Sequence, residues 1–493
     1  MHPMRRGRYT IISCAAIVSL IFFAALTYIV FGTVKISSLS FLISSLREVA
    51  AHNEVRAPEN KPPADTFPLF KLAQIFAGYK DPVTYLLVFQ NSDEMRPAGG
   101  FIGSYGILTV DAGHITGFRT EDSYNLDRKI PAVKRPAAPE PIAHYLSQPR
   151  FYFRDANWNP DFKESAERLL KFYKEEGGTE NPSGVLAVMP EAIKPILALI
   201  GSITVQGQTF TAENFTDALE YEVEINFASR GVHRVQRKKI ISEFGNELIA
   251  RLFALPLSKW PEVLQDVKTA LEEKQVLVYV TDPATQEIAE RENIAGRITQ
   301  TDGDYLGVFD ANMFSLKTDP YVPRAIFYRV VREPAGLMGY AEIVYRYPVS
   351  GPAWKTKGYR SWTRVYVPKG SVLVEARGAM EEELSKNPGK VEVSVESDKT
   401  VFGAFVAVQV GQVKRLSFKY RLPDSVETAV RNGRYELYVQ KQPGTVGHGL
   451  TVSTDFGTMP TTWSPTGLGA SRDGNRLIWQ TTLRRDQEFK VEF

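Results

Sequence analysis

The chain has 493 residues, of which 43% are hydrophobic and 23% charged, a composition typical of globular domains with sizeable cores. Its formal net charge of +3 lacks the basic excess of a nucleic-acid-binding protein, so no nucleic-acid partner is expected. The single cysteine, Cys14, lies in an apolar N-terminal run, which excludes disulfides and thiolate metal sites from the rest of the chain. The six histidines form no HExxH or HxH pair, which argues against a zinc enzyme.

The N-terminal region carries a strong membrane signal. Residues 9–34 include no charged side chain. As a helix, this run would be about 39 Å long, enough to cross a hydrocarbon core of roughly 30 Å with some tilt. Arg5, Arg6 and Arg8 precede the run and only Lys35 follows it closely, so the positive-inside rule predicts a cytoplasmic N-terminus.

We therefore predict a single-pass protein of the cell membrane, in contact with the lipid bilayer and with an extracytoplasmic body. Residues 1–8 would form a cytoplasmic tail and residues 9–34 a transmembrane helix, followed by a juxtamembrane helix and linker over residues 35–67. A cleaved signal peptide and a buried core helix are the alternatives. The run exceeds the roughly 7–15-residue apolar region of a signal peptide and has no small-residue cleavage site after it. Its charge-free length argues against a core helix.

Strand and helix patterns alternate over residues 68–321, which predicts a layered α/β domain. Residues 83–89, 102–110 and 115–120 are expected to be strands, and residues 111–114 a hairpin turn between the last two. Further strands are expected at residues 185–188, 276–280 and 305–309. Helices are expected at residues 161–176, 190–199, 211–224, 236–252, 262–272 and 284–290.

The pattern changes near Val322. From there to residue 493 the chain shows about nine short strands separated by proline and glycine turns. No helical run is expected beyond residues 381–386. This pattern predicts an all-β, immunoglobulin-like sandwich over residues 322–493.

A polar stretch at residues 90–101 is the first candidate site. It contains Asp93, Glu94, Arg96 and two glycines, and it follows a strong strand. Ligand sites in α/β sheets gather at strand ends, and an arginine suits a phosphate group. We expect a loop at the sheet edge that binds an anion. The alternative is an ordinary surface turn with solvated charges.

A basic cluster is the second candidate. Arg230, Arg234, Arg237 and Lys238 would share one face if this part of the chain were helical, with Lys239 beside them. Cations at the start of a helix oppose its macrodipole, and a bound anion would relieve that conflict. The alternative is a solvated helix face. Weaker candidates lie at other strand or helix ends: Asp122, Arg154, Asp155, Asp310, Asn312 and Lys317.

Four motifs together resemble an uncharacterised family of bacterial membrane proteins, catalogued as domain of unknown function 4012. They are YLLVFQNSDEMRPAGGFIGSYGILTV, RDANWNPDFKESA, DYLGVFDAN…K and KQPGT. The resemblance covers roughly residues 68–320 and extends into the β domain.

The order of features is also similar to that of the LytR-CpsA-Psr phosphotransferases, which attach polysaccharides to the bacterial wall from polyprenyl-pyrophosphate carriers. This similarity implies a layered α-β-α fold and a pyrophosphate site. It implies catalytic roles for Asp93, Glu94 and Asp122, with Asp93 and Asp122 as ligands of a magnesium ion. The implied pyrophosphate-binding residues are Arg96, Arg119, Arg230, Arg234, Arg237 and Lys238.

Three positions depart from the phosphotransferase pattern. Lys238 stands in place of a glutamine, and Glu121 in place of an arginine. Residues 96–99 lack the signature aspartate. The sequence thus leaves open whether the protein is an enzyme. We expect an extracytoplasmic envelope protein that binds, and in an active form transfers, a polyprenyl-phosphate-linked glycan. The alternative is a non-enzymatic scaffold or adhesion protein whose β-sandwich binds an envelope protein or glycan.

Overall fold

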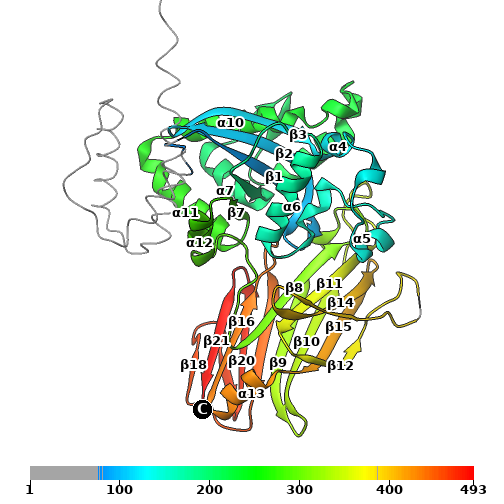
Figure 1. The fold of residues 1–493 in the computed structure, drawn as a ribbon, viewed down its shortest axis with the longest axis vertical. Coiled ribbons are helices and arrows are strands. Elements are labelled where there is room, and N and C mark those ends of the chain that lie inside the picture. The colour runs from blue at the N-terminus through cyan, green and yellow to red at the C-terminus, as the bar shows by residue number, and fades with distance from the viewer. Residues whose placement is uncertain (1–75, 77, 80, 386) are drawn as a thin grey trace, which may run out of the picture. The chain divides into compact units, whose positions relative to one another are not determined.

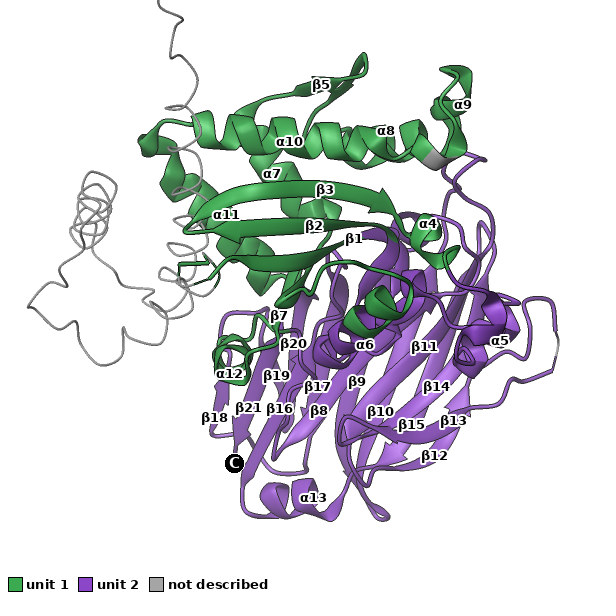
Figure 2. Cartoon of the chain, turned by 45° about the horizontal axis from the view of Figure 1, so that its top comes forward, with its two compact units in different colours: residues 1–89, 103–129, 170–295 green, residues 90–102, 130–169, 296–493 purple. Residues whose placement is uncertain are grey.

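The computed structural model describes residues 76, 78, 79, 81–385 and 387–493 (Figure 1). The predicted tail, transmembrane helix and juxtamembrane segment lie outside these residues. Within the described ranges, no helix is long and apolar enough to cross a membrane. The chain divides into two compact units (Figure 2). The α/β unit contains residues up to 89, 103–129 and 170–295, and the β-rich unit contains residues 90–102, 130–169 and 296–493.

A five-stranded sheet has the order β3-β2-β1-β4-β7. Its strands are β1 (Val83–Arg96), β2 (Gly99–Asp111), β3 (His114–Asp122), β4 (Gly184–Val188) and β7 (Val276–Val280). β4 runs parallel to β1 and antiparallel to β7, and β3 runs antiparallel to β2. The predicted strands in these regions are therefore confirmed. The division between the two units falls within β1 and β2.

The predicted hairpin turn between β2 and β3 is also present. Ala112 has a φ of 46° and Gly113 a φ of 82°. Two consecutive residues with positive φ form the tight turn that matches the twist of paired strands. The turn places β3 directly beside β2.

Helices of the α/β unit pack around this sheet. They are α4 (Ser123–Asp127), α7 (Pro190–Ile200), α8 (Phe215–Tyr221), α9 (Phe227–Ser229), α10 (Lys239–Ala254), α11 (Trp260–Glu272) and α12 (Pro283–Arg291). A small hairpin of β5 (Ile203–Val205) and β6 (Gln208–Phe210) follows α7. Proline at the first position of α7 and Gly201 at its end, with a φ of 81°, explain where that helix begins and stops.

The basic segment does not form the single helical face that its spacing suggested. Helix α9 ends at Ser229, Gly231 has a positive φ, and a short 3-10 turn covers residues 234–236 before α10 begins at Lys239. Gly231 breaks the helix because its backbone favours the left-handed conformation. Arg230 therefore lies apart from the start of α10.

The β-rich unit contains two seven-stranded sheets with the orders β12-β15-β10-β9-β17-β20-β19 and β13-β14-β11-β8-β16-β21-β18. The strands in chain order are β8 (Asp304–Asn312), β9 (Arg324–Glu333), β10 (Gly336–Arg346), β11 (Tyr359–Pro368), β12 (Val372–Arg377), β13 (Glu392–Glu396), β14 (Lys399–Val408), β15 (Val413–Arg421), β16 (Arg434–Gln440), β17 (His448–Asp455), β18 (Thr462–Ser464), β19 (Ser471–Asp473), β20 (Arg476–Leu483) and β21 (Gln487–Glu492).

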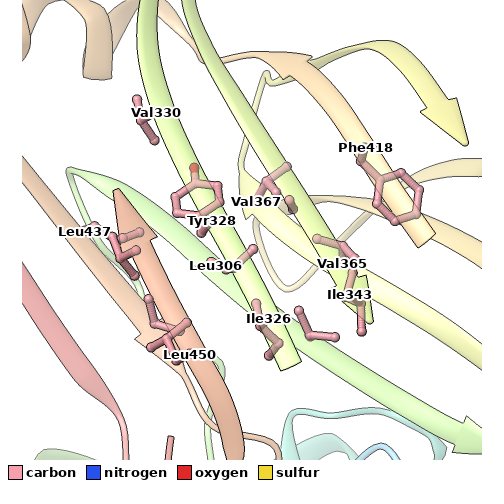
Figure 3. Close-up of a cluster of buried hydrophobic side chains, with 14 of the residues drawn as sticks. Leu306, Ile326, Tyr328, Val330, Ile343, Val365, Val367, Phe418, Leu437 and Leu450 are labelled. Atoms are coloured by element: carbon pink, nitrogen blue, oxygen red, sulfur yellow. The ribbon is translucent and has the colours of Figure 1, made fainter. Parts of the chain in front are cut away.

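Buried residues of both sheets form one hydrophobic core. Leu306, Ile326, Val365 and Phe418 lie in it and are each at most 2% exposed (Figure 3). The sequence pattern predicts such a β-sandwich, but this one has more strands than the nine expected. It also begins before residue 322, because β8 pairs with β11 and β16 rather than with the five-stranded sheet.

Helical segments of the β-rich unit correct another expectation. Helix α13 (Asp424–Arg431) lies beyond residue 386, and its buried Val426 and Val430 are spaced by one helical turn. Residues 381–384, in contrast, form bends and turns. The other helical segments are η2 (Ala132–Lys134), α5 (Glu140–Tyr145), η3 (Phe153–Trp158), η7 (Asp319–Tyr321) and α6 (Phe162–Glu175), the last of which spans the division between the units.

Candidate functional site

The polar stretch at residues 90–101 is not the loop that the sequence suggested. β1 continues to Arg96 and β2 resumes at Gly99, so that a tight hairpin replaces the expected loop. Polar residues are compatible with these strands because they find buried partners in the β-rich unit. The outcome shows that charges in a sequence do not by themselves indicate a solvated loop.

Arg96 lies at the centre of this buried network and is 1% exposed. Its guanidinium lies 3.0 Å from the carboxylates of both Glu94 and Asp155. It also donates to the carbonyl oxygens of Met95 and Asn312. Burial raises the pKa of Glu94 above its ordinary value, although Arg96 opposes this shift. Removing one of these three charges would destabilise the fold strongly, because the remaining charges would stay buried away from water without a partner.

Gln442 of the KQPGT motif connects the hairpin to the sandwich. Its side-chain amide donates to the carbonyl oxygens of Arg96, at 3.1 Å, and Asp310, at 2.7 Å. Its side-chain oxygen accepts from the Asp310 amide at 2.9 Å. Gly444 approaches the Gly99 backbone so closely that a Cβ there would lie 3.2 Å from the Gly99 Cα. The last family motif therefore contacts the first, although they are far apart in sequence.

Further motif residues complete the network. Asn157 donates to the Gly100 carbonyl at 2.7 Å. The Asp310 carboxylate accepts from Ser361 and Thr363 and lies 2.8 Å from the Arg324 guanidinium. All four motifs thus meet in one buried region of the β-rich unit.

The remaining candidate site residues of this unit also contact other side chains. Asn312 donates to Asp319 at 2.8 Å. Asp93 lies 2.6 Å from the ammonium of Lys355. Arg154 stacks on Tyr152. Lys317 lies close enough to Glu94 to lower the pKa of that carboxyl.

A different group of candidates meets in the α/β unit. Asp122, at the end of β3, caps α4 by accepting from the Tyr124 amide at 3.0 Å. Its carboxylate lies 3.1 Å from the Lys238 ammonium and 3.3 Å from the Arg237 guanidinium. Burial would raise the pKa of Asp122, but Lys238, the Tyr124 amide and Arg237 hold it below its ordinary value. Burial lowers the pKa of Lys238, and Asp122 opposes that shift.

An open pocket of about 330 Å³ lies beside this ion pair, where the end of β3 meets the first turn of α10. Its lining residues are Thr120, Glu121, Asp122, Asn125, Gln236, Lys238, Lys239 and Ser242. Lys238 is the N-terminal capping residue of α10, and its side chain makes no capping hydrogen bond. Thr120 and Ser242 bond to each other across the pocket wall, joining β3 to α10.

The other basic candidates of this unit have acidic partners or lie in solvent. Arg119 pairs with Glu121 and Glu180. Arg230 pairs with Glu222 at 2.8 Å. Arg234 is exposed, and Arg237 also pairs with Glu224 at 2.7 Å.

Sequence reasoning did not select Thr120, Asn125, Gln236 and Ser242. Thr120 and Asn125 flank Asp122 in sequence, and Ser242 lies one helical turn after Lys238, which is the signal that could have identified them. Arg96 and Asp93 belong to a different unit from Arg237 and Asp122, so a pyrophosphate site shared by Arg96 and Arg237 stays a prediction. Two cations within 3.3 Å of Asp122 make its carboxylate a poor magnesium ligand.

Residues 80–223 match the family model described as protein of unknown function, DUF4012. The match supports the predicted family over this part of the chain, which includes β1 to β4 and the residues around Asp122. No curated protein matches the chain.

Three solved structures show weak likeness. A putative nutrient-binding protein from Legionella pneumophila has a TM-score of 0.26 at 6% identity, covering 38% of this chain and 71% of that chain. Leukotriene A4 hydrolase from Saccharomyces cerevisiae has a TM-score of 0.20 at 11% identity, covering 35% of this chain and 28% of that chain. An M1 zinc metallopeptidase from Deinococcus radiodurans has a TM-score of 0.18 at 13% identity, covering 35% of this chain and 41% of that chain. The chain thus spans less than half of the two last proteins, and these low scores carry no functional argument.

Proposed function

We propose that this protein is anchored in the bacterial cell membrane and that its extracytoplasmic α/β unit binds the phosphate groups of a lipid-linked glycan. The observation that carries the proposal is the pocket between the end of β3 and the first turn of α10, lined by Lys238 and Lys239. The start of a helix attracts anions because its first amide groups lack intrahelical partners and its dipole is positive there.

The charges at the pocket favour an incoming phosphate. The acids on its wall, Glu121 and Asp122, are already paired with Arg119, Arg237 and Lys238. Lys239 is 73% exposed, and its nearest carboxylate partner, Glu243, is 3.9 Å away. Lys239 can therefore turn to an anion without breaking a buried ion pair, and charge-assisted contacts to phosphate are the strong kind.

A LytR-CpsA-Psr-like fold is part of the proposal. The strand, hairpin, strand and helix order around β1 to α10 supports it. The predicted transmembrane helix and short tether also suit a lipid-linked ligand, which cannot leave the bilayer.

Binding of a lipid-linked glycan is better supported than its transfer to an acceptor. Asp122 has a lowered pKa, which makes it a weak base. Asp93 and Glu94 belong to the other unit and face Lys355 and Arg96.

The experiment measures binding of a fluorescent polyprenyl-pyrophosphate analogue, and of inorganic pyrophosphate, to the full chain in detergent. Lys239→Ala should weaken binding by about tenfold or more, as expected for loss of one charge-assisted contact. Lys259→Ala is the matched control, because Lys259 is an exposed lysine outside the pocket lining that pairs with Glu262. Equal affinity of Lys239→Ala and wild type, with an unchanged melting temperature, would refute the site. Binding of pyrophosphate but not of the lipid analogue would refute the lipid-linked ligand.

A further inference from the structure

One edge of the β-sandwich ends in an exposed strand. Among the described strands, β13 pairs with β14 and with no other, so it is the edge of its sheet. Residues 392–395 are all exposed. An edge strand presents unpaired backbone amides and carbonyls, which can pair with another extended segment.

The neighbouring edge of the other sheet is protected, and β13 is not. β12 contains an irregularity between Leu373 and Glu375, which is a form of bulge that disturbs pairing. β13 pairs with β14 without interruption over residues 392–396. Figure 2 shows β12, β13 and α5 on the same side of the β-rich unit. The contrast shows that only one of these edges retains a regular pairing surface.

The exposed edge also carries an apolar row. Val393 lies opposite Phe402, a core residue with 0% exposure, so that both side chains face the same side of the sheet. Val393 itself is 58% exposed, and Val395 is 63% exposed. The inner apolar row therefore continues onto β13 and ends uncovered.

Acidic residues surround this edge. Glu140, Glu381, Glu382 and Glu392 all lie close enough to Tyr145 to help burial raise its pKa to about 12. Burial, Glu140 and Glu396 together raise the pKa of Glu392 above its ordinary value. The Tyr145 ring stacks on Phe405, with centroids 4.1 Å apart, which fixes α5 against β14. Glu396 is already paired with Arg364 at 3.0 Å, so the negative charge near the uncovered valines comes from Glu140, Glu381, Glu382 and Glu392.

We propose that the edge of β13 binds an extended segment of a partner protein in which basic and apolar side chains alternate, and that this segment pairs as an additional strand. The apolar side chains would cover Val393 and Val395, while the basic ones would meet the glutamates. A second copy of the chain fits poorly, because two paired β13 strands would bring Glu392 and Glu396 of both copies together. This mode of recognition combines backbone hydrogen bonds for affinity with alternate side chains for specificity.

The test uses the full chain and a capped ten-residue peptide of alternating lysine and valine. We expect the peptide to bind and to slow hydrogen exchange of the β13 amides that do not bond to β14. The double substitution Val393→Lys with Val395→Lys should weaken binding at least tenfold, because it adds like charge and removes the apolar cover. Val374→Lys is the matched control, since Val374 is an exposed valine, 57% accessible, on the bulged β12 edge. Glu392→Gln should weaken binding more at low salt than at high salt.

Several outcomes would overturn the proposal. They are no binding at millimolar peptide, equal binding by the double variant, and equal binding of a peptide N-methylated at alternate residues. Equal binding of a glutamate–valine peptide would remove the charge argument. Protection, before any peptide is added, of the β13 amides that do not bond to β14 would show that another segment or a second copy already occupies the edge. Light scattering would distinguish these two.

Discussion

The guanidinium of Arg96 lies 3.0 Å from the carboxylate of Asp155, a residue 59 positions later in the chain. Both side chains are at most 2% exposed. The two residues come from separate family motifs, and each was expected at a ligand site. Their pairing shows that the hairpin of β1 and β2 is held to η3 by a buried ion pair.

Arg96→Ala should destabilise the protein strongly. It would leave Glu94 and Asp155 buried without their cation, a loss of about 3–5 kcal/mol by analogy with other broken buried ion pairs. Denaturant unfolding followed by circular dichroism measures the change. Arg377→Ala is the control, since Arg377 pairs with Glu375 at the surface and is 77% exposed. An unchanged unfolding midpoint together with lost pyrophosphate binding would instead assign Arg96 to ligand binding.

Gly100→Ala should also destabilise the fold. A Cβ at Gly100 would lie 2.1 Å from backbone atoms of Asn91, so one of the strands must move. Movement would disturb the hydrogen bonds that Gly100 makes with Gln90 and Asn157. We expect a loss on the order of 1–3 kcal/mol, as for an overpacked core position. Gly467→Ala, where no atom lies within 4 Å of the added Cβ, should leave the melting temperature nearly unchanged.

Asp304 should make stability depend on pH. Burial raises the pKa of this carboxyl from 3.8 to about 6, although the hydroxyls of Tyr435 and Tyr328 donate to it. Because the pKa of Asp304 is higher in the folded than in the unfolded protein, its protonated carboxyl favours the folded state. This contribution to the free energy of unfolding is fully present below about pH 4 and is lost as the pH rises through 6. The loss amounts to about 3 kcal/mol.

The measurement compares unfolding free energies of wild type and Asp304→Asn from pH 4 to 7. The variant lacks the ionisation, so its stability should rise relative to wild type by up to about 3 kcal/mol over this range. Asp473→Asn, at an exposed position on β19, should show no such trend. A constant difference between wild type and Asp304→Asn would contradict the raised pKa.

The membrane topology can be tested directly. The arginines at positions 5, 6 and 8 predict a cytoplasmic N-terminus and an exposed body. Protease added to intact spheroplasts should therefore digest the body and leave only a small N-terminal fragment, detected by an N-terminal tag. A cytoplasmic protein of the same cells serves as the control for intact membranes. Full protection of the body would exclude an extracytoplasmic location.

Part of the candidate site followed from sequence. The cluster of Arg237 and Lys238 and the strand end at Asp122 were selected separately, and the structure brings them within 3.3 Å of one another. Arg96, in contrast, looked like a solvated or ligand-binding residue. Two of its partners, Asp155 and the Asn312 carbonyl, lie far away in the sequence, and no local pattern reveals such pairs.

The sequence by itself determined most of the secondary structure. Apolar runs predicted strands within β1 to β4, and the helix predicted at residues 190–199 matches α7. These features depend on neighbouring residues, whose spacing the sequence shows directly. Only the tertiary structure decided that β8 joins the sandwich, that the family motifs meet around Arg96 and Gln442, and that β13 is left at an edge. Those outcomes depend on which distant strands pair and which charges are buried together, and they are set by packing of the whole chain rather than by any local segment.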